Sequence, residues 1–186
     1  MSEFLLKALS LPGLFSVQHK RHEDTRGHFS RLFCERSLSG FDQPFHIRQI
    51  NHSCTREQGS VRGLHYQNGD HPEAKLITCL RGEVWDVAVD LRPDSPTFLH
   101  WHAEHLRAGD GRSLLIPAGF AHGFQTLTDD AELLYLHSAD YAPEHEGGLS
   151  VYEPRLAIAW PLAVKNLSAR DASHPLLDSR FSGVHV

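Results

Sequence analysis

One imidazole and two cations lie close together around the segment Val61–Gln67, where Arg62 and His65 flank Gly63 and Lys75 follows. An imidazole titrates near neutrality and can take or return a proton, and a lysine is a compact positive charge that can hold an anionic oxygen. A histidine between small and apolar neighbours is also common as a core residue with its hydrogen bonds satisfied. His65 is therefore either a structural residue or a general base.

The segment that carries His65 alternates as a β-strand does. Successive side chains of a strand point to opposite faces, so a regular strand places Gly63 and His65 on one face and Arg62 and Leu64 on the other. On this expectation, His65 faces the side of the sheet on which its own strand places no charged side chain.

The rest of the chain is rich in short strand patterns separated by Gly- and Pro-containing turns. The patterns cover two strands within 4–17, then 28–33, 46–52, 75–80, 83–91, 97–106, 114–116 and 131–137. One helical turn is expected over 35–40, and no other helix before the tail. This organisation indicates an all-β sandwich or barrel, and the length of 186 residues suits a single domain over 1–186.

Composition excludes several classes of function. A formal charge of −5 and a pI near 6.3 argue against a nucleic-acid partner, and no apolar run reaches the roughly 18 residues that a membrane span needs. The three cysteines, Cys34, Cys54 and Cys79, form no C-x-x-C pair and follow no secretory leader. We expect reduced thiols in a cytoplasmic protein, with most of the fifteen histidines at the surface.

The second half of the chain carries a more specific spacing. Gly111, Pro117, Gly119 and His122 reproduce the second signature of the cupins, small double-stranded jelly rolls. The first signature, counted from Gly63, expects metal ligands at 69, 71 and 75, where this chain has glycine, histidine and lysine. A lysine ammonium repels a divalent cation, so the spacing predicts a cupin barrel without its metal.

Many short motifs in order resemble one family over nearly the whole chain. They are Asp24-x-Arg26-Gly27-x-Phe29, Gln49-x-Asn51, Arg62-Gly63-Leu64-His65-x-Gln67, Lys75-Leu76, Asp86–Arg92, Pro117-x-Gly119–Phe124 and Leu167-Ser168-x-x-Asp171. Together the motifs resemble the dTDP-4-dehydrorhamnose 3,5-epimerases. The resemblance implies a cupin double-stranded β-helix (jelly roll) with a short helical C-terminal tail, a homodimer, no metal or other cofactor, and a dTDP-4-keto-6-deoxy sugar as substrate.

The chemistry of such a reaction assigns roles to these residues. A ketone at carbon 4 acidifies the hydrogens on carbons 3 and 5, so epimerisation needs a base, a cation for the enolate oxygen and an acid on the other face. His65 suits the base, and Lys75 suits the enolate oxygen. The resemblance implies that Asp171 fixes the tautomer of His65 and that Tyr135 is the acid, although a tyrosine in a strand is also an ordinary residue.

The resemblance also implies contacts to the nucleotide sugar from six further residues: Arg26, Arg62, Gln49, Asn51, His122 and Tyr141. Arginine matches phosphate oxygens in two places at once, so Arg26 and Arg62 suit the diphosphate, with Gln49 and Asn51 adding polar contacts. Either arginine could instead form a surface salt bridge. His122 could touch the sugar or pack in the barrel, and Tyr141 could stack on the base.

Three other interpretations of the function, and the identity of the base, stay open at this point. Some relatives invert carbon 3 alone in antibiotic-sugar pathways, and the sequence does not separate them from double epimerases. Arg31 stands where many relatives have a glutamate near the base, so the identity of the base is open. The remaining two are a metal-dependent cupin that uses His71 and His122, and a sugar-nucleotide binding module without catalysis.

Overall fold

The computed structural model describes residues 4–38, 40–41 and 45–186 of the chain. Its strands are β1 (Phe4–Ala8), β2 (Phe15–His19), β3 (Arg21–Asp24), β4 (Gly27–Ser30), β5 (Gln49–Thr55), β6 (Val61–Gln67), β7 (Lys75–Arg81), β8 (Glu83–Asp90), β9 (Trp101–Arg107), β10 (Arg112–Ile116), β11 (Phe120–Thr126), β12 (Ala131–His137) and β13 (Glu146–Gly148). The helical elements are short: η1 (Glu35–Leu38), η2 (Pro143–His145) and α1 (Ala169–Ser173).

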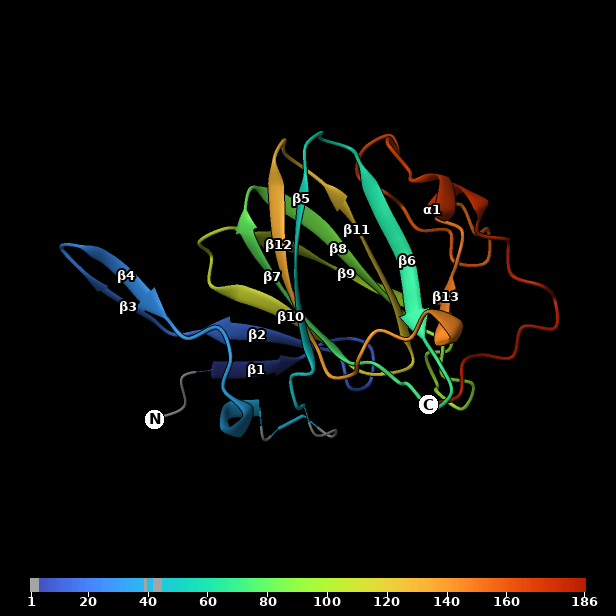
Figure 1. The fold of residues 1–186 in the computed structure, drawn as a ribbon, viewed down its shortest axis with the longest axis horizontal. Helices are drawn as coiled ribbons and strands as arrows, with labels where there is room; N and C mark the ends of the chain where they lie inside the picture. The colour runs from blue at the N-terminus through green and yellow to red at the C-terminus, as the bar shows by residue number, and fades with distance from the viewer. Residues whose placement is uncertain (1–3, 39, 42–44) are drawn as a thin grey trace.

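Two antiparallel sheets face each other and enclose the core (Figure 1). The first has the strand order β1-β2-β10-β7-β12-β5, and the second has the order β13-β6-β11-β8-β9. Ile77 and Leu133 of the first sheet pack with Val84, Ala88 and Phe124 of the second in one apolar cluster. The prediction of an all-β fold is confirmed, and the helical tail is limited to α1.

A hairpin of β3 and β4 extends away from both sheets (Figure 1). Its turn holds Thr25 and Arg26 between two short, mostly exposed strands. Its distance from the sheets bears on where Arg26 can act.

Strand β6 is not regular, which overturns the predicted alternation of its side chains. His65 pairs with His122 of β11, and Arg62 pairs with Phe124, so β6 uses one residue more than β11 over this stretch. Such a bulge rotates the following side chains to the other face. A β-carbon on Gly63 would lie 2.6 Å from the Cα of Gly123, so the two backbones approach each other here as only glycines allow.

Several element boundaries differ from the sequence-based expectation; the strand expected over 46–52 is Gln49–Thr55, and the strand expected over 28–33 is Gly27–Ser30. The strand predicted over 97–106 begins only at Trp101, because Thr97 and Ser95 form a turn whose hydroxyl groups donate to the buried carboxylate of Asp90 at 2.7 and 2.5 Å. The helical turn expected over 35–40 is the 3₁₀ turn η1.

The three cysteines carry free thiols, as expected. Among the described residues, no helix is both long and apolar enough to cross a membrane.

Candidate active site

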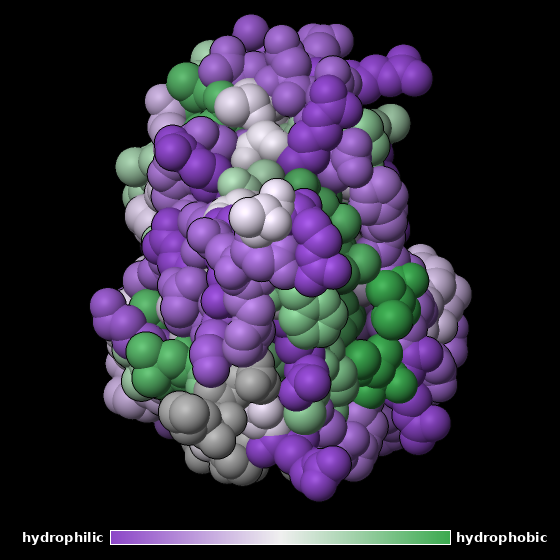
Figure 2. All heavy atoms as spheres, turned by 90° about the vertical axis from the view of Figure 1, so that its left-hand side faces the viewer, coloured by the Kyte–Doolittle hydropathy of each residue, from purple (hydrophilic) through white to green (hydrophobic). Residues whose placement is uncertain are grey.

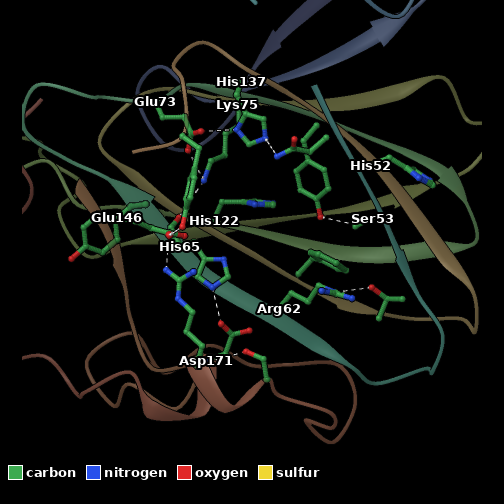
Figure 3. Close-up of a pocket in the computed structure, with 18 of the residues that line it drawn as sticks. His52, Ser53, Arg62, His65, Glu73, Lys75, His122, His137, Glu146 and Asp171 are labelled. Atoms are coloured by element: carbon green, nitrogen blue, oxygen red, sulfur yellow. Dashed lines mark hydrogen bonds and ion pairs between the residues drawn. The ribbon is translucent and has the colours of Figure 1, made fainter. Parts of the chain in front are cut away.

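A cavity of about 910 Å³ opens between the two sheets, within the size range of small-molecule sites (Figure 3). Nine of the ten predicted site residues line it: Gln49, Asn51, Arg62, His65, Lys75, His122, Tyr135, Tyr141 and Asp171. The bulge in β6 is what brings Arg62 and His65 to the same cavity. The tenth residue, Arg26, does not line it.

His65 and Asp171 form a hydrogen-bonded pair at one wall of the cavity (Figure 3). His65 Nε2 lies 2.7 Å from Asp171 Oδ1. A carboxylate only accepts, so Nε2 carries the ring proton and Nδ1 keeps a lone pair. The tautomer of His65 is therefore fixed, and its side chain, which is 32% exposed, lines the cavity rather than packing in the core.

Asp171 is placed by the start of the short helix α1. The Ser168 side chain caps this helix by accepting a hydrogen bond from the Asp171 backbone N–H at 3.0 Å. Burial alone raises the pKa of the Asp171 carboxyl, but the hydrogen bond from His65 and its positive charge when protonated outweigh it and hold the pKa below its ordinary value. Asp171 is thus ionised at neutral pH and can stabilise an imidazolium.

Lys75 is held at the other sheet by a buried carboxylate that the sequence analysis missed. Lys75 Nζ lies 3.1 Å from Glu73 Oε2, and both side chains are less than a tenth exposed. Glu73 Oε1 accepts a second hydrogen bond from His137 Nδ1 at 2.6 Å. Glu73 stands two residues before Lys75, so alternation along an extended segment could have placed both on one face.

Tyr135 extends from β12, in the sheet opposite to the one that carries His65. Its hydroxyl lies 3.2 Å from the Ser53 hydroxyl, and its ring stacks on that of His137 with centroids 6.0 Å apart. Burial raises the pKa of the Tyr135 phenol above its ordinary value, so the phenol stays protonated at neutral pH. Ser53 continues the alternation of Gln49 and Asn51 on β5, a signal the sequence analysis did not use.

His122 both packs in the barrel and lines the cavity. Its Nε2 donates to the two oxygens of Asp86 at 3.0 Å each, and Asp86 is completely buried. The ring of His122 meets that of Tyr135 edge-on at 6.1 Å. This bond to Asp86 fixes His122 in place between the two sheets.

Polar and cationic groups gather elsewhere on the cavity wall. Arg62 Nε donates to the Thr55 hydroxyl at 2.9 Å, which fixes the guanidinium against β5. The Gln49 side-chain amide donates to Asn51 Oδ1 at 3.0 Å. Tyr141 is half exposed, and its hydroxyl donates to Glu146 Oε2 at 2.7 Å.

Two further cations, Arg56 and Arg170, line the cavity and were not predicted. Arg170 Nη2 lies 2.6 Å from Glu146 Oε2, the oxygen that Tyr141 also reaches. No spacing in the sequence links these side chains, because α1, β13 and the loop before β13 meet only in the folded chain.

Arg26 lies in the turn of the β3–β4 hairpin, where its side chain is 87% exposed and paired with Asp24 at 2.5 Å. Within this chain the structure therefore does not bring Arg26 together with the other predicted site residues.

The residues at the cupin metal positions do not converge on an ion site. Gly69 and His71 lie in the loop before β7, and the His71 ring packs on that of His145 at 4.5 Å. Among the described residues, only His65, Asp171 and His174 form a group of three side chains that could hold a metal. His71 and His122 belong to no such group, which disfavours the metal-dependent cupin that would use them.

Comparison with known proteins decides the family. The sequence profile of the dTDP-4-dehydrorhamnose 3,5-epimerases matches residues 8–179. A dTDP-4-dehydrorhamnose 3,5-epimerase of Salmonella typhimurium is 39% identical over 91% of this chain and 93% of its own. The chain belongs to the dTDP-4-dehydrorhamnose 3,5-epimerase family. Its enzyme class, an isomerase, follows from this membership, and both predictions are confirmed.

Solved structures of the family have the same fold. The dTDP-6-deoxy-D-glucose-3,5-epimerase of Legionella pneumophila, in complex with dTDP-4-keto-L-rhamnose, superposes with a TM-score of 0.90 at 35% identity and covers 98% of both chains. The predicted cupin jelly roll is thereby confirmed. The dTDP-4-dehydrorhamnose 3-epimerase of Streptomyces niveus is also similar, at 35% identity over 96% of this chain and 87% of its own.

Proposed function

We propose that this protein epimerises a dTDP-4-keto-6-deoxyhexose at carbon 3, carbon 5 or both, through an enolate, in deoxysugar biosynthesis of the rhamnose type. The observation that carries the proposal is the arrangement of three groups in one cavity. The His65–Asp171 pair lies at the second sheet, which carries His65, and Lys75 and Tyr135 extend from the first sheet on the opposite side of the cavity. A ring bound between the sheets would meet a base and an acid on opposite faces.

In the first half of the reaction, His65 Nδ1 takes the proton from the carbon next to the ketone. The resulting imidazolium is stabilised by Asp171, which stays ionised. Electrons from the broken C–H bond move to the carbonyl oxygen, and the Lys75 ammonium holds the enolate that forms. The Lys75 side chain is less than a tenth exposed, so water screens its charge little.

In the second half, Tyr135 returns a proton on the other face of the ring. A phenol with a raised pKa remains a proton donor at neutral pH, and the bond to Ser53 holds it in position. The C–H bond re-forms with inverted configuration, the ketone is restored, and the negative charge passes to the Tyr135 phenolate, which regains a proton from water.

We propose that the dTDP group occupies the polar side of the same cavity. Arg62 suits the diphosphate, Gln49 and Asn51 suit polar atoms of the nucleotide, and Tyr141 suits stacking on the base. His122 is proposed to contact the sugar. We propose that Arg26 contacts the diphosphate in the cavity of a second chain, because it does not line the cavity of its own chain.

The assembly is proposed to be a homodimer. Leu5 and Ile50 lie on the two edge strands of the first sheet and Phe29 on the hairpin, and all three are more than half exposed. The face that carries the hairpin shows hydrophobic side chains among polar ones (Figure 2). Exposed edges and apolar side chains are better covered in a dimer.

We further propose that the enzyme works without a metal, as a single domain over residues 1–186, and in the cytoplasm. A free-thiol chain that acts on a nucleotide sugar fits that compartment. The replacement of a metal-ligand position by Lys75 supports the proposal of metal independence.

A second candidate function is epimerisation at carbon 3 alone, which the similarity to the Streptomyces niveus 3-epimerase favours. Incubation with dTDP-4-keto-6-deoxyglucose in deuterium oxide, followed by NMR, separates the two. Label at carbons 3 and 5 indicates a double epimerase, and label at carbon 3 alone indicates the second candidate. Binding without any label would show a non-catalytic module and overturn the proposed activity.

A further inference from the structure

His174, a residue with no predicted role, lies directly behind the proposed base. Its Nε2 is 3.8 Å from Asp171 Oδ1, the oxygen that also accepts the hydrogen bond from His65. The rings of His65 and His174 meet edge-on with centroids 5.8 Å apart. One ligand atom from each of the three side chains lies within 4.8 Å of the other two.

The surroundings of His174 leave its ring nitrogen available. Nε2 is buried and has no hydrogen-bond partner among the described residues, which is uncommon for a buried polar atom. Space for the ring exists because residue 148 is glycine, where a β-carbon would lie 2.2 Å from that nitrogen. His174 itself does not line the substrate cavity.

We propose that His65, Asp171 and His174 form a zinc site that inhibits the enzyme. Two imidazoles and one carboxylate are a donor set that zinc accepts in proteins, with a water completing the tetrahedron. Zinc-to-ligand distances near 2.1 Å place ligand atoms about 3.3 Å apart. The 2.7 Å contact of His65 with Asp171 would open slightly, and the 3.8 Å contact of His174 would close by a similar amount.

The consequence for catalysis follows from the two nitrogens of His65. A neutral imidazole has one ring proton and one lone pair. Zinc on Nε2 takes the place of the proton shared with Asp171, so the remaining proton is on Nδ1. Nδ1 then has no lone pair for the substrate proton, and Asp171 no longer supports an imidazolium.

This site lies behind the base rather than in the substrate cavity, so zinc should stop proton transfer without displacing the nucleotide. His65 lines the cavity and gives the ion a path of entry. The inhibition rests on the proposed function, but the binding of zinc does not. The two are therefore tested separately.

Zinc binding is measured on the full chain alone, by titration against a chromophoric chelator. The wild type should bind one zinc ion per chain, and His174→Ala and His174→Gln should each weaken binding by about tenfold or more. His100→Ala removes an exposed histidine from the loop before β9 and should change nothing. No zinc binding by the wild type, or equal affinity in the His174 variants, would overturn the site.

Inhibition is measured as deuterium exchange into the sugar at buffered free zinc. The wild type should lose exchange and regain it after EDTA, whereas His174→Ala should exchange normally and resist zinc by about tenfold or more. The affinity for dTDP should be unchanged by zinc in both proteins. Equal inhibition of both proteins would refute the proposal, while absence of exchange in every zinc-free sample would refute only the proposed function.

Discussion

At the scale of single residues, the ionised carboxylate of Glu73 pairs with the Lys75 ammonium on one wall of the cavity. Burial disfavours its ionisation, but Lys75 and the hydrogen bond from His137 outweigh this and lower the pKa of Glu73 to about 2. His137 Nδ1 donates to Glu73 at 2.6 Å, and its Nε2 lies 3.3 Å from the Asn51 amide nitrogen. The ammonium of Lys75 is thus paired, and its position is fixed before substrate arrives.

Replacing this carboxylate should destabilise the protein strongly. Glu73→Gln leaves the Lys75 ammonium buried without its counter-charge, which costs about 3–5 kcal/mol. Urea unfolding at pH 7 measures the loss, and Glu144→Gln, at an exposed position, is the matched control with a change within about 0.5 kcal/mol. A loss no larger than that of the control would mean that the ion pair does not form.

The same carboxylate predicts a pH dependence. The pKa of Glu73 is about 2 in the folded chain and 4.5 ordinarily, so between these values only the unfolded chain takes up the proton. The stability difference between wild type and Glu73→Gln should therefore be full above pH 4.5 and shrink as the pH falls toward 2. Unfolding curves across this range test the sign, and a difference that grows with acid would contradict it.

The pair of His65 and Asp171 predicts graded losses of activity. His65→Asn should remove deuterium exchange at both carbons, because one base is proposed to serve both. Asp171→Asn leaves the imidazole in place but weakens its orientation and the stabilisation of its charge, so exchange should fall by about 10²-fold or more.

Tyr135→Phe should behave differently from both, because it removes the returning acid and leaves the base intact. Deuterium wash-in should continue while net inversion slows. NMR of the sugar carbons measures all three variants. Wild-type exchange by the His65 variant at either carbon would redirect the search to His122, the other motif histidine in the cavity.

At the scale of elements, the contact between β6 and β11 aligns the site. A β-carbon on Gly123 would lie 2.7 Å from the Arg62 carbonyl oxygen and 2.9 Å from a Leu64 methyl group. Gly123→Ala should push β6 away, cost about 1–3 kcal/mol by overpacking, and lower activity by up to about 10²-fold as His65 shifts.

Gly109→Ala separates this effect from the general cost of replacing a glycine. Gly109 has a positive φ, which Gly123 does not, and a β-carbon at Gly109 would meet nothing within 4 Å. Gly109→Ala should lower the free energy of unfolding by about 1 kcal/mol and leave activity unchanged. Equal activity of the two variants would show that the close approach of β6 and β11 does not position the base.

The same contact explains what sequence reasoning predicted and what it missed. Strand periodicity and turn residues place most strands correctly, because a half-buried sheet imposes alternation on its sequence. Periodicity fails in β6, since one extra residue reverses the faces after it and only the pairing with β11 reveals it. The contact between Glu73 and His137 was not predicted for a related reason. It depends on how β7 and β12 pair, and no short motif encodes that pairing.

At the scale of the whole molecule, metal independence is a direct prediction. Turnover should survive EDTA, because Lys75 is proposed to supply the positive charge that a metal would bring to the enolate. If the inhibitory zinc site is occupied after purification, EDTA should raise turnover instead. Turnover that falls on chelation and returns with zinc, iron or manganese would contradict metal independence.

The open edges of the first sheet predict how two chains associate. Leu5 lies on the edge strand β1 with 68% of its surface exposed, and an unpaired strand with an apolar residue is a ready surface for a second copy. The chain should sediment as a dimer at micromolar concentration.

Leu5→Glu places a charge in the predicted contact and should shift the equilibrium toward monomers, whereas Leu176→Glu, the same substitution at another exposed leucine, should not. Because Arg26 does not line the cavity of its own chain, we expect it to reach a diphosphate in the cavity of a second chain. Leu5→Glu should therefore weaken dTDP binding in step with dissociation, and a fully monomeric variant that binds dTDP normally would remove Arg26 from the site.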